Sequence, residues 1–171
     1  MRSGVLDIFQ ATQPHDWNAA RALLALYGAE LERHFGLTGV TETQEALEAA
    51  YPAPGGLWLA SSGEPVGCVA LRPLGPKEGE LKRLFMLPGA RGRGVGRSLL
   101  ETALGAARAA GFRSIRLDTL PGMEAAQALY AALGFRPCAP YGARTLPGAR
   151  FFELLLDAAG TAPRDGGPSR G

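Results

Sequence analysis

The spacing of apolar positions divides the chain into an alternating series of helices and strands. Residues 14–35 carry apolar side chains three or four positions apart, which predicts one amphipathic helix or a bent pair of helices. Two apolar runs, at 57–61 and 66–74, flank a Ser-Gly-Glu-Pro sequence and predict an antiparallel hairpin. A weakly alternating segment at 5–9 predicts an edge strand ahead of the first helix.

The second half of the chain has a strand–helix–strand order around a glycine-rich turn. A strand predicted at 80–87 leads to the turn at 91–96, which opens a helix with one apolar side. Strands predicted at 115–119 and 151–156 enclose a helix predicted at 123–133. Such crossovers favour parallel pairing and the hairpin favours antiparallel pairing, so we expect an α/β (α+β) fold with a mixed sheet and helices on both faces.

Two further segments complete the expected domain. The sequence Thr-Glu-Thr-Gln at 41–44 has the spacing of a capping box ahead of a short helix, which Pro52 and Pro54 end. Residues 158–171 are rich in Gly, Pro, Ser and Arg and predict a disordered tail. With 171 residues in all, the chain is long enough for one domain, which we place at 1–157, to bury a core without disulfides or metal.

Composition and charge exclude several classes of protein. The 46% hydrophobic and 20% charged residues are ordinary for a globular chain and exclude wholesale disorder. A net charge of +2 is too weak to indicate a nucleic-acid partner. Cys68 and Cys138 lie too far apart for a metal site or a secreted disulfide framework. No apolar run is long enough for a membrane span or a signal peptide, so we expect a cytoplasmic protein without a metal or a membrane partner.

Residues 91–98, Arg-Gly-Arg-Gly-Val-Gly-Arg-Ser, predict an anion-binding site. Glycines at alternate positions directly before a helix leave backbone N–H groups uncovered, and the helix N-terminus adds about half a positive charge. Arg91, Arg93 and Arg97 supply further positive charge. The segment lacks the Gly-Lys-Ser/Thr of a P-loop and the glycine spacing of the dinucleotide fingerprint. The alternative is that these glycines only let the strand and the helix pack closely.

The segment from Glu80 to Leu100 resembles the central motif of the GNAT N-acetyltransferase superfamily. In that motif an Arg or Gln is followed by two residues, Gly, one residue, and Gly or Ala, and Arg91, Gly94 and Gly96 match it. A second motif resembles the fourth helix of the superfamily and the turn that follows it, at Ala126, Leu129-Tyr130 and Gly134-Phe135. The similarity covers residues 5–156 and implies the GNAT acyl-CoA N-acyltransferase fold, with a mostly antiparallel sheet of six to seven strands.

The resemblance implies that the protein binds acetyl-CoA as a cosubstrate. Backbone amides from Gly92 to Ser98 would hold the pyrophosphate, and the pantetheine would lie along Leu84–Leu87, beside a strand bulge that the sequence does not place. The amide of Met86 or Leu87 would face the thioester oxygen. Met123 stands where many relatives have an asparagine that contacts the pantetheine. The implied cofactor-binding residues are Leu84, Phe85, Met86, Leu87, Arg91, Gly92, Arg93, Gly94, Val95, Gly96, Arg97 and Ser98.

Direct acetylation of an amine needs a base and an acid, and the resemblance suggests one residue for each role. Glu80 falls where histone-type relatives place a glutamate that deprotonates the amine, often through a water. Its alternative is a solvated carboxylate beside Lys77 and Lys82. Tyr130 matches the position whose hydroxyl protonates the CoA sulfur in many relatives, and its alternative is a half-buried helix tyrosine.

The predicted function is therefore acetyl transfer from acetyl-CoA to a primary amine of a small molecule or protein, by direct attack in a ternary complex. One alternative is a CoA-binding sensor or regulator without turnover. Another is a nucleic-acid-binding protein that uses Arg91, Arg93 and Arg97, although we expect no nucleic-acid partner. A monomer and a homodimer paired through the edge of the last strand both remain open.

The sequence does not identify the amine acceptor. The candidates for contact with it are His34, Asp118, Tyr141 and Arg144, each with a surface or structural alternative. We expect Trp17, Trp58 and Cys68 to be core residues. The glutamates of the first two helices, Glu30, Glu32, Glu42, Glu45 and Glu48, are expected to lie on solvated helix faces.

Overall fold

The structure is a computed structural model that describes residues 4–37, 42–142 and 146–157. The predicted disordered tail at 158–171, Thr41 and the acceptor candidate Arg144 lie outside the described residues. Among the described residues, no helix is both long and apolar enough to cross a membrane.

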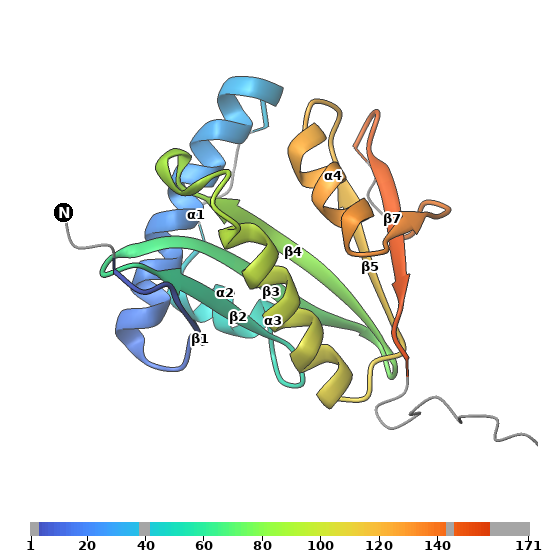
Figure 1. The fold of residues 1–171 in the computed structure, drawn as a ribbon, viewed down its shortest axis with the longest axis horizontal. Helices are drawn as coiled ribbons and strands as arrows, with labels where there is room; N and C mark the ends of the chain where they lie inside the picture. Colours follow the sequence, from blue (N-terminus) through green and yellow to red (C-terminus); the bar gives the residue numbers. More distant parts are fainter. Residues whose placement is uncertain (1–3, 38–41, 143–145, 158–171) are drawn as a thin grey trace, which may run out of the picture.

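A seven-stranded sheet forms the centre of the fold, with the strand order β1-β2-β3-β4-β5-β7-β6 (Figure 1). The strands are β1 (Asp7–Gln10), β2 (Gly56–Ser61), β3 (Pro65–Gly75), β4 (Glu78–Met86), β5 (Ser114–Thr119), β6 (Arg136–Pro137) and β7 (Arg150–Leu155). Every neighbouring pair is antiparallel except β4 and β5, which are parallel. The expected mixed, mostly antiparallel sheet is confirmed. The short strand β6 pairs with Phe152 and Glu153 of β7, which leaves less of the last strand free for the homodimer pairing that the sequence leaves open.

Helices cover both faces of this sheet (Figure 1). They are α1 (Pro14–Phe35), α2 (Gln44–Ala50), α3 (Val95–Ala109) and α4 (Glu124–Ala132), with a short 3-10 helix η1 (Pro88–Ala90). Side chains alternate along β2: Leu57 and Leu59 join the core under α1 and α2, whereas Trp58 and Ala60 join the core under α3. The apolar spacing at 14–35 thus forms one helix, and it ends at Gly36 with φ 67°.

The short helix α2 begins differently from the prediction. Its N-cap is Thr43, whose side chain accepts a hydrogen bond from the Ala46 N–H at 3.2 Å. A capping box over 41–44 is therefore wrong, because the helix starts at Gln44 itself. Glu42 is thereby left outside the helix and pairs with Arg83 of β4.

A bulge in β4 opens the sheet where the functional site lies. Cys68 pairs with Phe85 and Ala70 pairs with Lys82, so two residues of β4 oppose one residue of β3. One of the two is Arg83, whose φ of 59° lies in the left-handed region. The strands β4 and β5 pair only from Glu78 to Glu80, and beyond that point they separate (Figure 1).

Candidate active site

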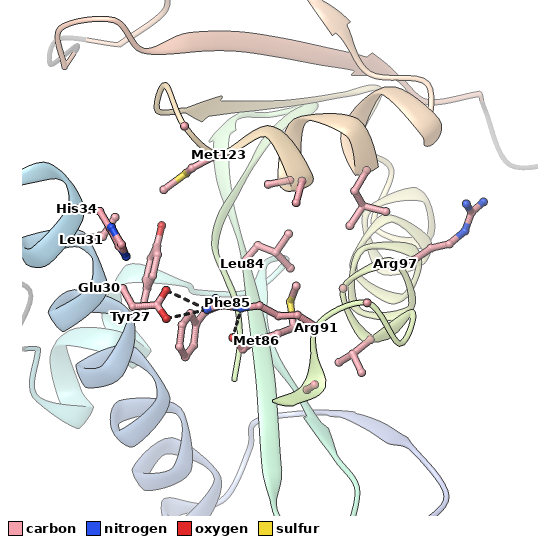
Figure 2. A pocket seen from close by; sticks show the side chains of 18 of the residues that line it. Tyr27, Glu30, Leu31, His34, Leu84, Phe85, Met86, Arg91, Arg97 and Met123 are labelled. Carbon is pink, nitrogen blue, oxygen red and sulfur yellow. Dashed lines mark hydrogen bonds and ion pairs between the residues drawn. The ribbon is translucent and has the colours of Figure 1, made fainter. Parts of the chain in front are cut away.

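A cavity of about 720 Å³ lies beside the separated strands (Figure 2). It lies between α1, the end of β4, the glycine turn and α4, and its volume is within the roughly 300–1,000 Å³ of ligand-binding cavities. The predicted cofactor-binding residues that line it are Leu84, Phe85, Met86, Arg91, Gly92, Gly94, Val95, Gly96 and Arg97. Leu87, Arg93 and Ser98 do not line it.

The glycine turn presents backbone N–H groups to this cavity. Gly92 and Gly94 have φ of 73° and 80°, a left-handed conformation that favours glycine, and Gly94 caps α3. The first N–H groups of a helix have no acceptor within the helix. Ser98 is already past them, since its N–H donates to the Gly94 carbonyl at 3.0 Å. The N–H groups that lack an acceptor within the helix therefore end at Arg97, and the predicted binding of a pyrophosphate by the amides of Gly92 to Ser98 stays a prediction.

Gly96 has a different reason to be glycine. A Cβ there would lie 2.8 Å from Cε of Met86 and 3.3 Å from Cδ2 of Leu129. It allows the first turn of α3 to approach the end of β4 and α4 closely. The close-packing alternative thus holds at Gly96, whereas Gly92 and Gly94 are required by their backbone conformation.

Arg91 connects the glycine turn to α1 across the cavity (Figure 2). Its guanidinium donates to both carboxylate oxygens of Glu30 at 2.9 Å, and its Nε donates to the Met86 carbonyl at 3.1 Å. Arg97 similarly pairs with Glu101 at 2.9 Å. The expectation that Glu30 is only solvated is wrong. Two of the arginines expected to attract an anion already have carboxylate partners, which also disfavours the nucleic-acid alternative.

A second cavity, of about 230 Å³, adjoins the first. Both cavities are lined by Tyr27, Leu31, Leu84, Met123 and Ala126. The smaller one also contains Lys82, Arg83, Asp118 and Tyr130. Of the acceptor candidates, Asp118 therefore reaches the smaller cavity and His34 lines the larger one.

The phenol of Tyr130 is buried, with the residue 7% exposed, and it lines the smaller cavity. Its ring packs edge to face on Phe135 at 5.8 Å. Burial raises the pKa of Tyr130, and the neighbouring Tyr27 and Asp118 raise it further. The hydroxyl consequently keeps its proton at neutral pH and is available as a donor.

Glu80 is neither solvated nor part of a cavity. The residue is 3% exposed, and its Oε1 accepts from Nε of Arg72 at 2.7 Å. Its Oε2 lies 3.8 Å from Nζ of Lys82. The alternative of a solvated carboxylate is wrong, and Arg72 already occupies Oε1, while Lys82 lies near Oε2 without a hydrogen bond to it. The predicted role of Glu80 as the base stays a prediction.

Tyr141, another acceptor candidate, also lies outside both cavities. Its ring packs edge to face on Phe151 at 5.4 Å, and the Arg116 guanidinium lies 5.7 Å from the ring centroid. Burial raises the pKa of Tyr141, as does the Glu80 carboxylate. These contacts give Tyr141 a packing role on the far side of Glu80.

Comparison with known proteins assigns the chain to a family. Residues 15–135 match the acetyltransferase (GNAT) family. The chain belongs to this family. An uncharacterised N-acetyltransferase of Schizosaccharomyces pombe is 28% identical to this GNAT protein over 160 residues, which are 91% of this chain and 98% of that protein.

Solved structures share the GNAT fold. An acetyltransferase from Streptococcus agalactiae has a TM-score of 0.74 at 24% identity and covers 91% of this chain and 100% of its own. The structure of yncA from Salmonella typhimurium with its cofactor acetyl-CoA has a TM-score of 0.70 at 19% identity, over 94% of this chain and 98% of its own.

Several site residues of this GNAT protein were not predicted from its sequence. Tyr27 and Glu30 belong to α1, whose pattern of apolar and polar residues is typical of any surface helix. This pattern does not mark the two residues as part of a site. In the sequence Lys82 stands out only as a neighbour of Glu80, although in the structure its Nζ lies 3.3 Å from Oδ1 of Asp118. No local signal distinguishes these residues, because each acquires its role from a partner elsewhere in the chain.

The core predictions are confirmed. Trp17, Trp58 and Cys68 are 8%, 5% and 0% exposed. Burial raises the pKa of the Cys68 thiol to about 12, so it is an inert core residue. Within the described ranges, no group of three or more His, Cys, Asp or Glu side chains is arranged to hold a metal ion.

Proposed function

We propose that this protein transfers an acetyl group from acetyl-CoA to a primary amine of a small molecule or protein. The observation that carries the proposal is the continuity of the two cavities. The uncovered N–H groups at the start of α3 open onto the larger cavity, and the buried Tyr130 hydroxyl opens onto the smaller one. The GNAT family, the N-acetyltransferase from Schizosaccharomyces pombe and the acetyl-CoA bound to yncA support it.

The residues around the larger cavity fit acetyl-CoA, which supplies an activated acetyl thioester. The N–H groups of Val95, Gly96 and Arg97 are suited to a pyrophosphate, because they lie at a helix N-terminus behind left-handed glycines. The end of β4 that β5 leaves unpaired, from Leu84 to Met86, lines the larger cavity, and Leu84 also lines the smaller one. Arg93 is proposed only as an exposed positive charge near the turn.

Of the two amides suggested as oxyanion donors, Met86 is the better candidate. The Leu87 N–H donates to the Val66 carbonyl of the neighbouring β3 at 2.8 Å and is therefore occupied. Successive N–H groups of a strand point to opposite sides, which directs the Met86 N–H toward the side that β5 has left. A donor in that place would stabilise negative charge on the thioester oxygen.

The proposed reaction is a direct transfer. The amine nitrogen bonds to the acetyl carbon while the carbon–sulfur bond breaks, the amine loses one proton, and the CoA sulfur gains one. Tyr130 donates the proton to the sulfur, which its raised pKa permits, since the phenol is protonated at neutral pH. A cytoplasmic location and a monomeric or homodimeric state stay predictions.

Steady-state release of the CoA thiol across a panel of amines and amino acids tests this function. Tyr130→Phe should lower kcat about 100-fold without weakening CoA binding, because only proton transfer is lost. Tyr141→Phe removes a hydroxyl that lies outside both cavities but beside Glu80, and it should lower kcat far less than Tyr130→Phe. If CoA binds tightly but no amine releases thiol above background, the protein is a CoA-binding sensor instead.

A further inference from the structure

The smaller cavity is lined by two cations, Lys82 and Arg83, and one anion, Asp118, in largely apolar surroundings, and Arg83 is already paired with Glu42. Nζ of Lys82 lies 3.3 Å from Oδ1 of Asp118, and these side chains are 31% and 28% exposed. Leucines from α1, β4 and the loops form much of the remaining wall. We infer that the acetyl acceptor is a compact α-amino acid with an apolar side chain, whose ammonium binds Asp118 and whose carboxylate binds Lys82. This inference rests on the proposed N-acetyltransferase function.

Charge balance in the cavity argues against an acceptor that carries only a positive charge. Arg83 is already paired with Glu42, and Glu80 is already paired with Arg72. A simple ammonium that approaches Asp118 must therefore share this carboxylate with Lys82, so two cations compete for one anion. Repulsion between Lys82 and the ammonium therefore disfavours such an acceptor.

An α-amino acid removes this conflict because it brings its own anion. Its ammonium nitrogen and carboxylate oxygen lie roughly 3 Å apart by standard bond lengths. That separation is close to the 3.3 Å between Nζ of Lys82 and Oδ1 of Asp118. The substrate can thus lie alongside the ion pair, with each of its charges facing the opposite charge of the protein. One internal ion pair is supplemented by two pairs to the substrate, and no buried charge loses its partner.

The same position suits the chemistry of acetyl transfer. Asp118 and Tyr130 line one cavity, and Leu84, Met123 and Ala126 line both this cavity and the larger one. An amine on Asp118 would therefore lie between the proton donor and the space assigned to the thioester. The bound ammonium must give up one proton before its nitrogen can attack and a second as the amide forms. Asp118, the carboxylate that lines this cavity, would receive the first, and the second replaces the proton that Tyr130 gives to the sulfur.

The size and composition of the wall select the side chain of the acceptor. At about 230 Å³, the cavity is smaller than the roughly 300–1,000 Å³ typical of drug-sized ligands. Leu31, Leu81 and Leu120 offer no hydrogen-bonding groups on their side chains. A branched or aromatic apolar side chain gains from burial against them, whereas a second charged group has no partner there.

Matched acceptors test this inference. Leucine, leucinamide and isoamylamine share a side chain and differ only at the carboxylate, and thiol release gives kcat/KM for each. Leucine should be preferred over isoamylamine by about 30-fold, the value of one well-placed ion pair. Lys82→Met should abolish that preference, whereas Lys77→Met, in the exposed turn between β3 and β4, should keep it. Asp118→Asn should lower kcat/KM for all three amines.

The outcomes separate this inference from the proposed function. If leucinamide or isoamylamine is used as well as leucine, or if Lys82→Met keeps the preference, the amino-acid acceptor is wrong and the acetyltransferase proposal stands. If no amine releases thiol, the acetyltransferase proposal is wrong. Calorimetry of leucine with the CoA-bound protein then decides recognition by itself: binding lost in Lys82→Met supports the amino-acid site, and no binding to the wild-type protein overturns it.

Discussion

The two adjoining cavities are built in different ways. In the larger cavity, the proposed anion-binding wall comes from one short segment, 91–97, all of which except Arg93 lines the cavity, and its proposed donors are backbone N–H groups. In the smaller cavity, the polar groups are side chains from separate strands, and Lys82 and Asp118 are 36 positions apart in the chain. A backbone site can be predicted from local sequence, whereas a side-chain site exists only after distant strands have been brought together.

The cavities also differ in what a ligand must displace. A bound pyrophosphate would compete with Glu30 for Arg91, an ion pair whose side chains are 24% and 45% exposed. An acceptor in the smaller cavity would meet Lys82 and Asp118, and Lys82 also lies 3.8 Å from the buried carboxylate of Glu80, which pairs with Arg72. Substitutions at the larger cavity should therefore alter mainly CoA binding. Substitutions at the smaller cavity should also alter the free energy of unfolding.

The largest expected effect comes from a substitution in the glycine turn that lines the larger cavity. Gly94→Val places a β-branched residue at φ 80° and should weaken CoA binding about 100-fold, because the turn must rearrange. Gly105→Ala in the same helix is the matched control. It has open space around its Cβ and should stabilise the fold by about 1 kcal/mol without affecting CoA binding. Calorimetry with CoA measures both variants, and equal affinities would refute a backbone cradle.

Glu80→Gln tests whether the buried carboxylate acts through structure or through proton transfer. Loss of its charge leaves Arg72 without an ionic partner, so the free energy of unfolding should fall by about 2 kcal/mol. We expect kcat to fall by less than about tenfold. Glu64→Gln, in the exposed β2–β3 turn, is the control for urea denaturation and thiol release. A far larger loss of kcat at unchanged stability would instead identify Glu80 as the base that the family resemblance suggests.

Cys68 lies in the core beside the bulge of β4, with its Sγ 3.4 Å from the Arg83 carbonyl oxygen. Burial raises the pKa of the Cys68 thiol from about 9 to about 12. Between these pH values the thiol stays protonated in the folded state and is ionised in the unfolded state. This stabilisation is complete below pH 9 and is lost as the pH rises toward 12, by about 1.4 kcal/mol per pH unit.

The comparison of wild type with Cys68→Ala isolates this contribution. The wild-type protein should be more stable at pH 8, and its advantage should narrow by about 1.4 kcal/mol at pH 10, by urea denaturation. A constant difference between the two proteins across that range would show that the thiol is not responsible.

The smallest expected effect comes from the ion pair that a pyrophosphate must displace. Glu30→Gln releases Arg91 and should tighten CoA binding a few-fold, because exposed ion pairs contribute about 0–1 kcal/mol. Glu32→Gln, on an exposed position of the same helix, should leave the affinity unchanged. The gain should shrink at high salt. Weaker CoA binding in Glu30→Gln would mean that Glu30 holds Arg91 in its binding position.

The sequence by itself determined the features that depend on neighbouring residues. The apolar spacing predicted the order of helices and strands, since periods of two and about 3.6 follow from local backbone geometry. The glycine turn is predicted from residues close together in the chain and Tyr130 from the resemblance to the GNAT superfamily, and the structure brings both to the cavities. The glycine pattern does not show where the uncovered N–H groups end. The Ser98 N–H already donates to the Gly94 carbonyl within the helix.

Only the tertiary structure decided which charges meet. The bulge at Arg83 depends on the register of β3 against β4, and one residue of shift would turn Lys82 to the other face of the sheet. The separation of β4 and β5 after Glu80 then creates the smaller cavity and leaves Asp118 beside Lys82. Packing of α1 against the sheet brings Glu30 to Arg91. These partners are far apart in the chain, so their pairing follows from the packed fold and not from any local pattern.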